Sequence, residues 1–512
     1  MQLSKKGIFI LFFLLTISLF LYAQAPLHKD IRTLVVFFDG LRPDYITEEN
    51  MPNLYAFSKS GCYGKQHHSV FPTVTRVNAS SFSTGSYPGT HGLIGNTVYF
   101  PFVDKKNVLN TGAYTDLLKI NDATKGQLLT AVTLGEVLQE AGAKMMVFSS
   151  GSTGQALMQN HKVSGGAVVN PALILPESFK EKISAEIGPP PPNAEPNTAQ
   201  HQWVTNALIK YGLTLEGPLV STIWYSDPDG VAHDDGIGAR SSMESIKIVD
   251  TEFGRILASL KEKKLDKNFN IIISADHGFA TYVGKTAVTE FLIKQGLKKD
   301  KDSEDVIVVA GAIYVRDHDK VVIQKIVSML QAQEWIGGIF TPSKKAGDVQ
   351  GSTAGTLSFE SIHWNHEERI PDILVDENWD DRKNDKGYSG TSFSVGVAGH
   401  GGLSPYEVHI ALLASGPSFK KNISSELPTS NVDIAPTILA IHKIPVPSSM
   451  DGRILNELLF ETRATELTAK KEKLTASATF DGGKYTLTLY RTVVDDHQYV
   501  DFAKVERVFE KP

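Results

Sequence analysis

Short apolar runs alternate along the chain with longer segments in which apolar residues recur every three or four positions. The short runs are typical of buried strands, whereas the longer segments have the period of amphipathic helices. Because the two types alternate, the pattern favours an α/β fold with a largely parallel central sheet. The predicted strands are Arg32–Phe38, Lys144–Ser149, Val220–Tyr225, Asn268–Ser274, Asp305–Ala310, Ile373–Val375 and Val408–Ala414, and the predicted helices are Thr133–Ala141, Ser241–Lys264, Lys320–Gln333 and Asn431–His442.

Three long stretches between these elements have weak local patterns, namely Thr97–Lys125, Ser149–Asn197 and Ala346–Ser394. Within the second of them, Gly188–Asn197 contains four consecutive prolines, which indicate a surface loop. Binding residues are often carried by such connecting segments on a rigid scaffold. We therefore expect small cap insertions that shape the substrate pocket.

The sequence changes character at its C-terminal end. A charged run, Thr462–Leu474, has a helical pattern, whereas Lys484–Arg491 and Tyr499–Phe509 alternate between apolar and polar residues as half-exposed strands do. We expect residues 25–460 to form the main domain and residues 461–512 to form a helix followed by a small β appendage.

The first residues have the three parts of a secretory signal peptide. Lys5 and Lys6 form a charged start, Gly7–Tyr22 is an apolar run, and Ala23-Gln24-Ala25 has the small-x-small pattern of a cleavage site. The apolar run is short for a bilayer-spanning helix, which needs about 20 residues. We expect residues 1–24 to be removed and the protein to be periplasmic or secreted, with an uncleaved N-terminal anchor as the alternative. No transmembrane domain is expected after signal removal.

Composition narrows the chemistry further. Of the 512 residues, 41% are hydrophobic and 21% are charged, as in ordinary globular chains. The formal charge of −6 offers no basic field for a nucleic-acid polymer. Cys62 is the single cysteine, which excludes an intrachain disulfide and any metal site built from several thiolates. A metal site in this chain would therefore use mainly histidine and carboxylate ligands.

Acidic residues and histidines follow several of the predicted strands. In an open α/β sheet, ligands bind beyond the carboxyl ends of the strands, so these side chains are expected to share one site. Each has another explanation by itself, since an aspartate after a strand is commonly a turn or cap residue and His233 alone would suit an exposed surface. The residues are Asp39 after the first strand, Asp229 and His233 after the third, Asp276 and His277 after the fourth, and His400 in the segment GVAGHGG.

The joint occurrence of these residues points to metal ions. Three aspartates and three histidines without thiolates suit Zn²⁺, which accepts imidazole nitrogen and carboxylate oxygen. Six ligands divide into two sets of three, and each set leaves a position open for substrate or nucleophile. We therefore predict two zinc ions as cofactors.

Thr75 is the candidate nucleophile. It precedes Asn78–Thr84, a stretch of small residues that can form a helix. At a helix start, backbone N–H groups and the positive end of the dipole favour a bound phosphate, and an adjacent metal would favour the alkoxide of the hydroxyl. The alternative is that Thr75 is an N-cap, a position in which threonine is common.

Six motifs make the chain resemble the type I phosphodiesterase/nucleotide pyrophosphatase branch of the alkaline phosphatase superfamily. The motifs occur in the order of that family. The resemblance implies an alkaline-phosphatase-like three-layer fold and an exported two-zinc hydrolase. Its substrate would be a small phosphate ester, in which it cleaves phosphodiester or nucleotide pyrophosphate bonds. The motifs are FFDGLRPDY (37–45), MPNLYAFSKSG (51–61), FPTVTRVN through TGSYPGTHGLIGN (71–96), DPDGVAH (227–233), SADHG (274–278) and GHGGLSPYEVH (399–409).

The resemblance also implies a role for each of these residues. Thr75 would be the nucleophile and would carry a phospho-threonine intermediate that water then hydrolyses. Asn96 would hydrogen-bond a non-bridging phosphate oxygen. By the same resemblance, one zinc would be held by Asp229, His233 and His400, and the other by Asp39, Asp276 and His277 together with Thr75.

The chain departs from the family directly after the nucleophile. Many members have an aromatic residue, then Pro and Asn-His, whereas here Thr75 is followed by Arg76, Val77, Asn78 and Ala79. The substrate pocket is therefore not the standard nucleotidase one. Arg76 either contacts the phosphate or points into solvent, and both interpretations remain open at this point.

Other activities occur on this fold. Sulfatases need a Cys or Ser in a C/S-x-P-x-R context, but Cys62 lies in GCYGKQH. A cofactor-independent phosphoglycerate mutase does not suit an exported chain, and an inactive binding protein would lack a ligand or the nucleophile. A phosphate monoesterase is the main alternative. We predict a preference for diesters because no third Asp, Glu and Thr cluster is evident and SSGSTGQALMQNHKVSGGAVVN offers only Lys162 as a permanent cation.

Overall fold

The computed structural model describes residues 30–461 and 467–510, so the expected signal peptide lies outside the described residues. A nine-stranded sheet forms its centre, in which β1 pairs in parallel with β8 on one side and β9 on the other. Strand β19 runs antiparallel to its neighbours β9 and β2. The predicted α/β class with a largely parallel sheet is confirmed. In order across the sheet, the strands are β20 (Ile423–Ser430), β2 (Cys62–His68), β19 (His409–Ser415), β9 (Phe269–Ser274), β1 (Arg32–Phe38), β8 (Val220–Tyr225), β5 (Met145–Ser149), β6 (Ala167–Asn170) and β7 (Leu173–Leu175).

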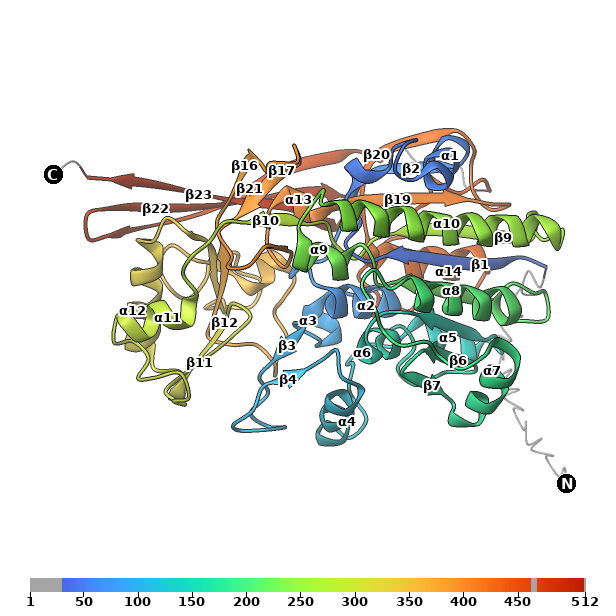
Figure 1. Cartoon of the computed structure of the whole chain (residues 1–512). Coiled ribbons are helices and arrows are strands. Elements are labelled where there is room, and N and C mark those ends of the chain that lie inside the picture. The colour runs from blue at the N-terminus through green and yellow to red at the C-terminus, as the bar shows by residue number, and fades with distance from the viewer. Residues whose placement is uncertain (1–29, 462–466, 511–512) are drawn as a thin grey trace, which may run out of the picture.

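Strand β1 is buried on both faces, which explains its continuous apolar sequence. Val35 and Phe37 contact one layer of helices, whereas Leu34, Val36 and Phe38 contact the other. Alternate side chains of one strand therefore belong to two cores, and the fold has three layers. The first core includes residues of α2 (Thr75–Thr84), α4 (Tyr114–Ala123), α5 (Leu134–Glu140), α6 (Thr153–Met158) and α14 (Ile434–Ile441), and the second includes residues of α1 (Pro52–Ser60), α7 (Lys180–Ile187), α8 (Thr198–Ala207) and α10 (Arg240–Glu262) (Figure 1).

The four predicted helices form close to their expected bounds. Two of them are α5 and α10, and a third is α12 (Lys320–Gln331). Thr133 precedes α5 in a capping box, because its hydroxyl accepts the Glu136 N–H and the Glu136 carboxylate accepts the Thr133 N–H. The fourth segment divides into a short 3-10 turn, Asn431–Asp433, followed by α14.

Two predicted strands lie outside the central sheet. The segments predicted at 305–310 and 373–375 become β11 and β15 of a separate five-stranded sheet. This sheet lies beside α11 and α12 at one end of the molecule (Figure 1). Its order is β11 (Val306–Val309), β12 (Ala312–Val315), β15 (Ile373–Glu377), β13 (Ile336–Thr341) and β14 (Leu357–Ser358), and the remaining short elements include β3 (Thr97–Val98), β4 (Leu109–Asn110), β10 (Ala280–Tyr282), β16 (Trp379–Lys383), β17 (Ser389–Ser392), β18 (Ala398–Gly399), α3 (Pro88–His91), α11 (Val288–Lys294) and α13 (Pro405–Val408).

Strand β2 has a polar sequence, CYGKQHH, that does not predict a buried strand. It nevertheless pairs with β19 and β20 inside the sheet. His67, near its end, is fully buried, and its Nδ1 hydrogen-bonds Thr429 Oγ1 on β20 at 2.7 Å. Side-chain hydrogen bonds between neighbouring strands therefore satisfy polar groups that the local pattern would place in solvent.

A strand replaces the C-terminal part of the helix expected at the start of the C-terminal appendage. Residues 462–466 lie outside the described residues, but the expectation of a helix over Thr462–Leu474 is wrong from the start of β21 (Ala469–Phe480). This strand pairs with β22 (Gly483–Val494), which pairs with β23 (His497–Phe509). Its lysines and glutamate favour helix by intrinsic propensity, but pairing with β22 along the whole strand overrides that preference. The three strands extend along one side of the molecule (Figure 1).

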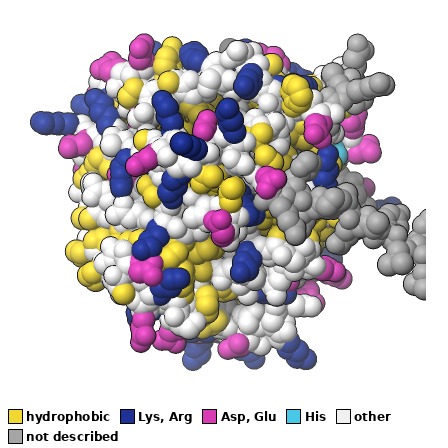
Figure 2. All heavy atoms as spheres, turned by 90° about the vertical axis from the view of Figure 1, so that its right-hand side faces the viewer, with side chains coloured by type: hydrophobic (Ala, Val, Ile, Leu, Met, Phe, Trp, Pro, Cys, Tyr) yellow, Lys and Arg dark blue, Asp and Glu magenta, His cyan; other side chains and the backbone are white. Residues whose placement is uncertain are grey.

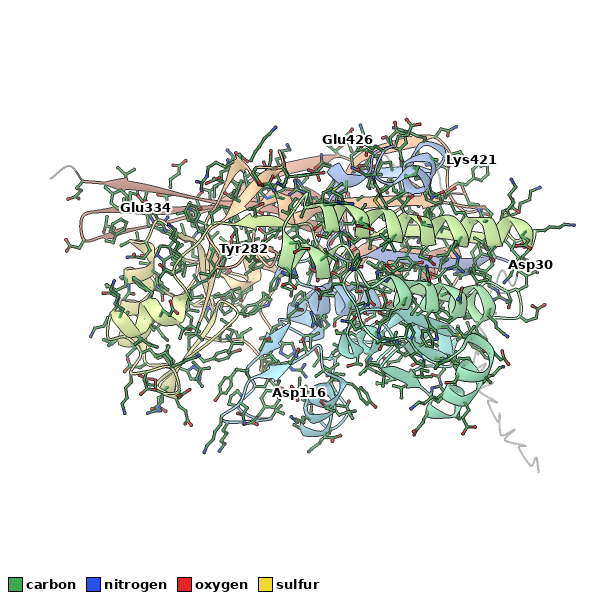
Figure 3. All side chains as sticks on the ribbon, viewed as in Figure 1. Asp30, Asp116, Tyr282, Glu334, Lys421 and Glu426 are labelled. Atoms are coloured by element: carbon green, nitrogen blue, oxygen red, sulfur yellow. The ribbon has the colours of Figure 1, made fainter. Side chains whose placement is uncertain are left out.

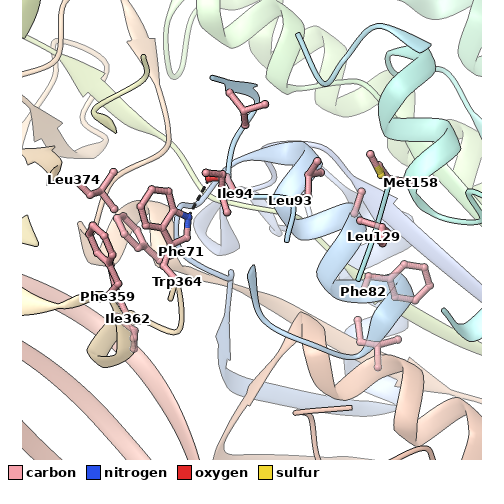
Figure 4. Close-up of a cluster of buried hydrophobic side chains, with 14 of the residues drawn as sticks. Phe71, Phe82, Leu93, Ile94, Leu129, Met158, Phe359, Ile362, Trp364 and Leu374 are labelled. Carbon is pink, nitrogen blue, oxygen red and sulfur yellow. Dashed lines mark hydrogen bonds between the residues drawn. The ribbon is translucent and has the colours of Figure 1, made fainter. Parts of the chain in front are cut away.

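An apolar cluster supports the segment that leads to the predicted nucleophile (Figure 4). Trp364 is buried, and its Nε1 donates to the Ile94 carbonyl at 3.0 Å. Its ring packs edge-on against Phe359, with centroids 5.2 Å apart. Phe71 belongs to the same cluster. The chain therefore enters α2 from a well-packed core.

The surface carries charged side chains of both signs, in agreement with the small formal net charge of −6. Lys and Arg side chains are interspersed with Asp and Glu on the face that Figure 2 shows. Within residues 30–461 and 467–510, no helix combines the length and the apolar character needed to cross a membrane.

Candidate active site

Three adjacent strands bring the acidic residues to one place. Strands β9, β1 and β8 run parallel, so their carboxyl ends lie at the same edge of the sheet. Asp39 follows β1, Asp276 follows β9, and Asp229 begins α9 (Asp229–Asp235) shortly after β8. Gly40, with a φ of +72°, permits the turn in which its N–H donates to Asp276 Oδ1 at 3.0 Å.

Two histidines converge on Asp229. His233 lies one helical turn after it on α9, and its Nε2 is 3.2 Å from Asp229 Oδ1. His400 follows β18 directly and places its Nε2 3.2 Å from the same oxygen. The three ligand atoms lie within 4.8 Å of one another, which is close enough for one metal ion.

The remaining three side chains form a second set beside the first. His277 Nε2 is 3.1 Å from Asp276 Oδ2 and 3.5 Å from Asp39 Oδ1. It is also 3.9 Å from Asp229 Oδ1, so the Asp229 carboxylate lies between the two sets. The rings of His277 and His400 stack with centroids 3.3 Å apart. The structure thus brings all six predicted side chains together.

Backbone carbonyls orient the three histidines. His233 Nδ1 lies 3.1 Å from the Ala398 carbonyl, and His400 Nδ1 lies 2.8 Å from the Thr73 carbonyl. His277 Nδ1 lies 3.0 Å from the Gly278 carbonyl. A carbonyl only accepts, so each Nδ1 carries a proton, and Nε2 is the ring atom that faces the carboxylates. This is the arrangement in which histidines bind metals.

The carboxylates create a need for positive charge. Among the described residues, Asp39 Oδ1, Asp229 Oδ1 and Asp276 Oδ2 are buried oxygens without a hydrogen-bond partner. Burial, followed by the charges of Asp276 and Asp229, raises the pKa of Asp39 well above its ordinary value. Burial opposes ionisation of Asp229 too, but the imidazoles of His233 and His400 hold its pKa well below the ordinary value. Bound cations would relieve this repulsion, and the imidazole and carboxylate donors fit Zn²⁺.

Helix α2 presents Thr75 to the same cluster. Val74 is the N-cap residue and Thr75 is the first helical residue, with no side-chain capping bond from Val74. The interpretation of Thr75 as an N-cap is therefore wrong. Its Oγ1 lies 3.3 Å from His277 Nε2, so the hydroxyl faces the metal-binding side chains at a helix N-terminus.

Asn96 and Arg76 flank the hydroxyl. Asn96 Oδ1 accepts the backbone N–H of Arg76 at 3.0 Å, which orients the amide against the start of α2. The Arg76 side chain lines the cavity next to Thr75 instead of projecting into bulk solvent. Burial lowers the pKa of Arg76, while the carboxylates of Asp39, Asp229 and Asp276 oppose that effect. Its Nε is buried and has no hydrogen-bond partner among the described residues.

A cavity of about 470 Å³ opens at Thr75 and Arg76. Its opposite wall comes from residues of the predicted insertion Ser149–Asn197, among them Ser150 and Asn170. Lys162, which we expected as a cation near the site, forms a surface ion pair with Glu136 at 2.6 Å and is not one of the lining residues.

A second cavity, of about 210 Å³, is lined in part by His400. Asn96, Tyr282 and Asp376 line it, the last from the predicted insertion Ala346–Ser394. The Tyr282 hydroxyl, labelled near the middle of Figure 3, donates to the His400 carbonyl at 3.2 Å. Thr97 and Val98 of the insertion Thr97–Lys125 also line this cavity, so all three predicted insertions contribute residues to the space around the candidate metal-binding side chains.

Some residues that contact the side chains of the site and orient them could not be identified from the sequence. Trp224 on β8 donates its Nε1 proton to Asp39 Oδ2 at 2.9 Å, and its ring stacks on Phe37. Its position in an apolar strand gave no sign of this contact. Ser150 Oγ is 2.9 Å from His201 Nδ1, whose Nε2 is 2.8 Å from Asp227 Oδ2.

Comparison with known proteins assigns the family. The sequence model described as type I phosphodiesterase / nucleotide pyrophosphatase matches residues 33–391, which include Thr75, Arg76, Asn96 and every candidate ligand except His400. The chain belongs to this family. Membership places it among hydrolases that act on phosphate esters. The human ectonucleotide pyrophosphatase/phosphodiesterase family member 5 is 23% identical to it over 416 residues, or 80% of this chain and 73% of that protein. Family member 3 of the mouse and of the rat is longer, and the match to this chain covers only 26% of its length.

Solved structures agree on the fold. Murine ectonucleotide pyrophosphatase/phosphodiesterase 5, as an inactive variant in complex with AMP, superposes with a TM-score of 0.60 at 19% identity, covering 84% of this chain and 100% of that one. The alkaline phosphatase PafA superposes with a TM-score of 0.63 at 17% identity, covering 85% and 100%. The three-layer architecture expected from the resemblance is thus confirmed.

The contact between Trp224 and Asp39 gives a first prediction. Trp224→Phe keeps an aromatic ring against Phe37 but removes the N–H that orients the Asp39 carboxylate. Loss of such a contact typically lowers metal affinity or activity about 10- to 100-fold, so kcat/KM on bis-p-nitrophenyl phosphate should fall by that factor.

The matched control is Trp203→Phe, which removes a buried indole N–H donated to the Gly188 carbonyl away from the carboxylates. Its kcat/KM should stay within about twofold of the wild type. Equal losses in both variants would show that Trp224 has only a general packing role.

Proposed function

We propose that this chain is a two-zinc phosphodiesterase of small phosphodiesters or nucleotide pyrophosphates that acts through a phospho-threonine at Thr75. The observation that carries the proposal is the position of Thr75 Oγ1, 3.3 Å from His277 Nε2 and at the first residue of α2. One ion would be held by Asp229, His233 and His400, and the other by Asp39, Asp276 and His277. Bound zinc would supply positive charge that stabilises phosphoryl oxygens and favours the threonine alkoxide.

The residues of the chain define the course of the reaction. Thr75 Oγ attacks phosphorus in line with the departing oxygen, forming a bond from Thr75 to phosphorus while the bond to the leaving group breaks. Arg76 and the amide of Asn96 donate hydrogen bonds to non-bridging oxygens and hold the phosphoryl group against the start of α2. A water molecule then attacks the phospho-threonine from the vacated side, which releases phosphate monoester and restores the Thr75 hydroxyl.

The substrate class follows from family and cavity together. A relative of the same fold has been solved with AMP, which supports a nucleotide-sized group for this chain too. The cavity beside Thr75 has polar walls from Ser150, Asn170 and Asn197, which suit hydroxyl and amide groups of a small organic ester. Action outside the cytoplasm accords with the apolar run at the N-terminus.

A phosphate monoesterase is the second candidate, and one observation favours it. Arg76 lines the cavity next to the nucleophile. A guanidinium there suits the dianion of a monoester, which carries more charge on its non-bridging oxygens than a diester does. The family to which the chain belongs supports the diester as the first choice.

Thr75→Ala tests the nucleophile. Removing the hydroxyl leaves all six ligand side chains, so zinc content should persist while turnover falls by on the order of 10⁴-fold. Thr75→Ser keeps a nucleophilic hydroxyl and should retain appreciable turnover. Rapid acid quench of the wild type during turnover of a ³²P-labelled diester should yield label on Thr75.

Thr84→Ala is the matched control, because Thr84 lies on the same helix and its buried hydroxyl donates to the Ser80 carbonyl at 2.8 Å. Its turnover should match the wild type. If Thr75→Ala has near-normal turnover and the acid-quenched wild type carries no label on Thr75, the covalent mechanism is wrong.

Arg76→Ala distinguishes the two candidate functions. We expect wild-type kcat/KM for bis-p-nitrophenyl phosphate to exceed that for p-nitrophenyl phosphate, and Arg76→Ala to lower both by about 10- to 100-fold, since one charge-assisted contact is lost for each substrate. Arg382→Ala, at an exposed pair with Asp380, should change neither value. A wild-type preference for the monoester that disappears selectively in Arg76→Ala would identify a phosphatase.

A further inference from the structure

A second group of metal-binding side chains lies outside the active site. It consists of His68 at the end of β2, His409 at the start of β19 and Asp501 on β23. His68 and His409 are directly opposite each other in the antiparallel pair of β2 and β19. Asp501 comes from the C-terminal sheet, so the group joins the appendage to the central sheet.

The geometry of the three side chains is compact. One ring nitrogen of each histidine and one oxygen of Asp501 lie within 4.8 Å of one another. His68 Nε2 is 2.9 Å from Asp501 Oδ1, and the two imidazole rings meet edge-on with centroids 5.1 Å apart. The other oxygen of Asp501 accepts a hydrogen bond from Thr492 Oγ1 at 2.8 Å, which fixes the carboxylate.

The hydrogen-bond partners of His68 indicate that positive charge is needed between its Nε2 and Asp501. Its Nδ1 lies 3.0 Å from the Thr429 carbonyl, which only accepts, so Nδ1 carries the proton. In a neutral ring, the Nε2 lone pair would then face the negatively charged Asp501 oxygen directly. Either a second proton or a metal ion must separate them.

The surroundings of His409 favour a metal ion over a second proton on His68. Its Nε2 is buried and has no hydrogen-bond partner among the described residues. A proton on His68 satisfies Asp501 alone and leaves this nitrogen unpaired, at a cost that buried polar groups rarely bear. A metal ion could accept electron pairs from both histidines and the carboxylate at once.

We propose that His68, His409 and Asp501 bind a third divalent metal ion of the zinc class, which fastens the C-terminal sheet to the central sheet. Two imidazole nitrogens and one carboxylate oxygen are a donor set that zinc accepts, with water as a fourth ligand. The Asp501 side chain is 14% exposed, so water and the ion can reach it. The hydrogen bond from His68 to the Thr429 carbonyl provides the outer support that metal-binding histidines usually have.

Metal content of the full chain tests the site. After loading with zinc and removal of excess metal, the wild type should retain one equivalent more than His409→Gln, measured by mass spectrometry of the digested protein. His318→Gln is the matched control, because His318 pairs with Asp372 at 2.8 Å as a plain His–carboxylate pair and should lose no metal. Equal metal content in the wild type and His409→Gln would overturn the proposal.

A second experiment uses a variant with weakened active-site metal binding, so that metal at the proposed third site is measured separately from the proposed catalytic metals. In the double variant Asp39→Asn/Asp229→Asn, which weakens both active-site sets, one equivalent should remain and should disappear when His409→Gln is added. Zinc should raise the melting temperature of the double variant by about 3 °C and have no effect on the triple variant. A double variant that retains no zinc and shows no shift would contradict the third site, even if the wild type binds two ions.

Discussion

Mutual repulsion among three buried carboxylates is the constraint that the active site has to satisfy. Parallel pairing of β9, β1 and β8 places Asp276, Asp39 and Asp229 at one edge, because each follows its strand closely. Burial and this proximity disfavour full ionisation unless positive charge is present, as the raised pKa of Asp39 shows. Three histidines and the guanidinium of Arg76 gather around the same point. The architecture therefore creates a strongly negative pocket that attracts cations and, with cations bound, attracts phosphate.

Orientation comes from contacts that are distant in sequence. The carbonyls of Ala398 and Thr73 determine which nitrogen of His233 and His400 faces the carboxylates. Trp224 does the same for Asp39 from the neighbouring strand. Such partners limit the motion of each ligand before any ion binds, which reduces the reorganisation needed on binding. They also connect the central sheet, the helix layer and the segment after β18 into one site.

The central sheet and many of the site residues could be predicted from the sequence, because the carboxyl ends of parallel strands lie at one edge of the sheet in an α/β fold. The sheet and five of the candidate ligands followed from apolar runs and the polar residues after them. His400 and Thr75 followed from a glycine-rich segment and a possible helix start, and the family motifs implied their roles. The polar strand β2 and the strand β21 could not be predicted, since side-chain hydrogen bonds and cross-strand pairing stabilise them instead of a local apolar pattern. The position of Arg76 also required the structure, because a single residue after a helix start can face either the cavity or solvent.

We propose that two metal ions occupy the space between these side chains next to Thr75. Zinc-loaded crystals of the full chain, measured on both sides of the zinc absorption edge, would locate such ions. We expect two anomalous peaks about 4 Å apart in this site, one near His233 and His400 and one near His277 and the Thr75 hydroxyl. One peak or none there, in crystals of active protein, would rule out the two-metal site.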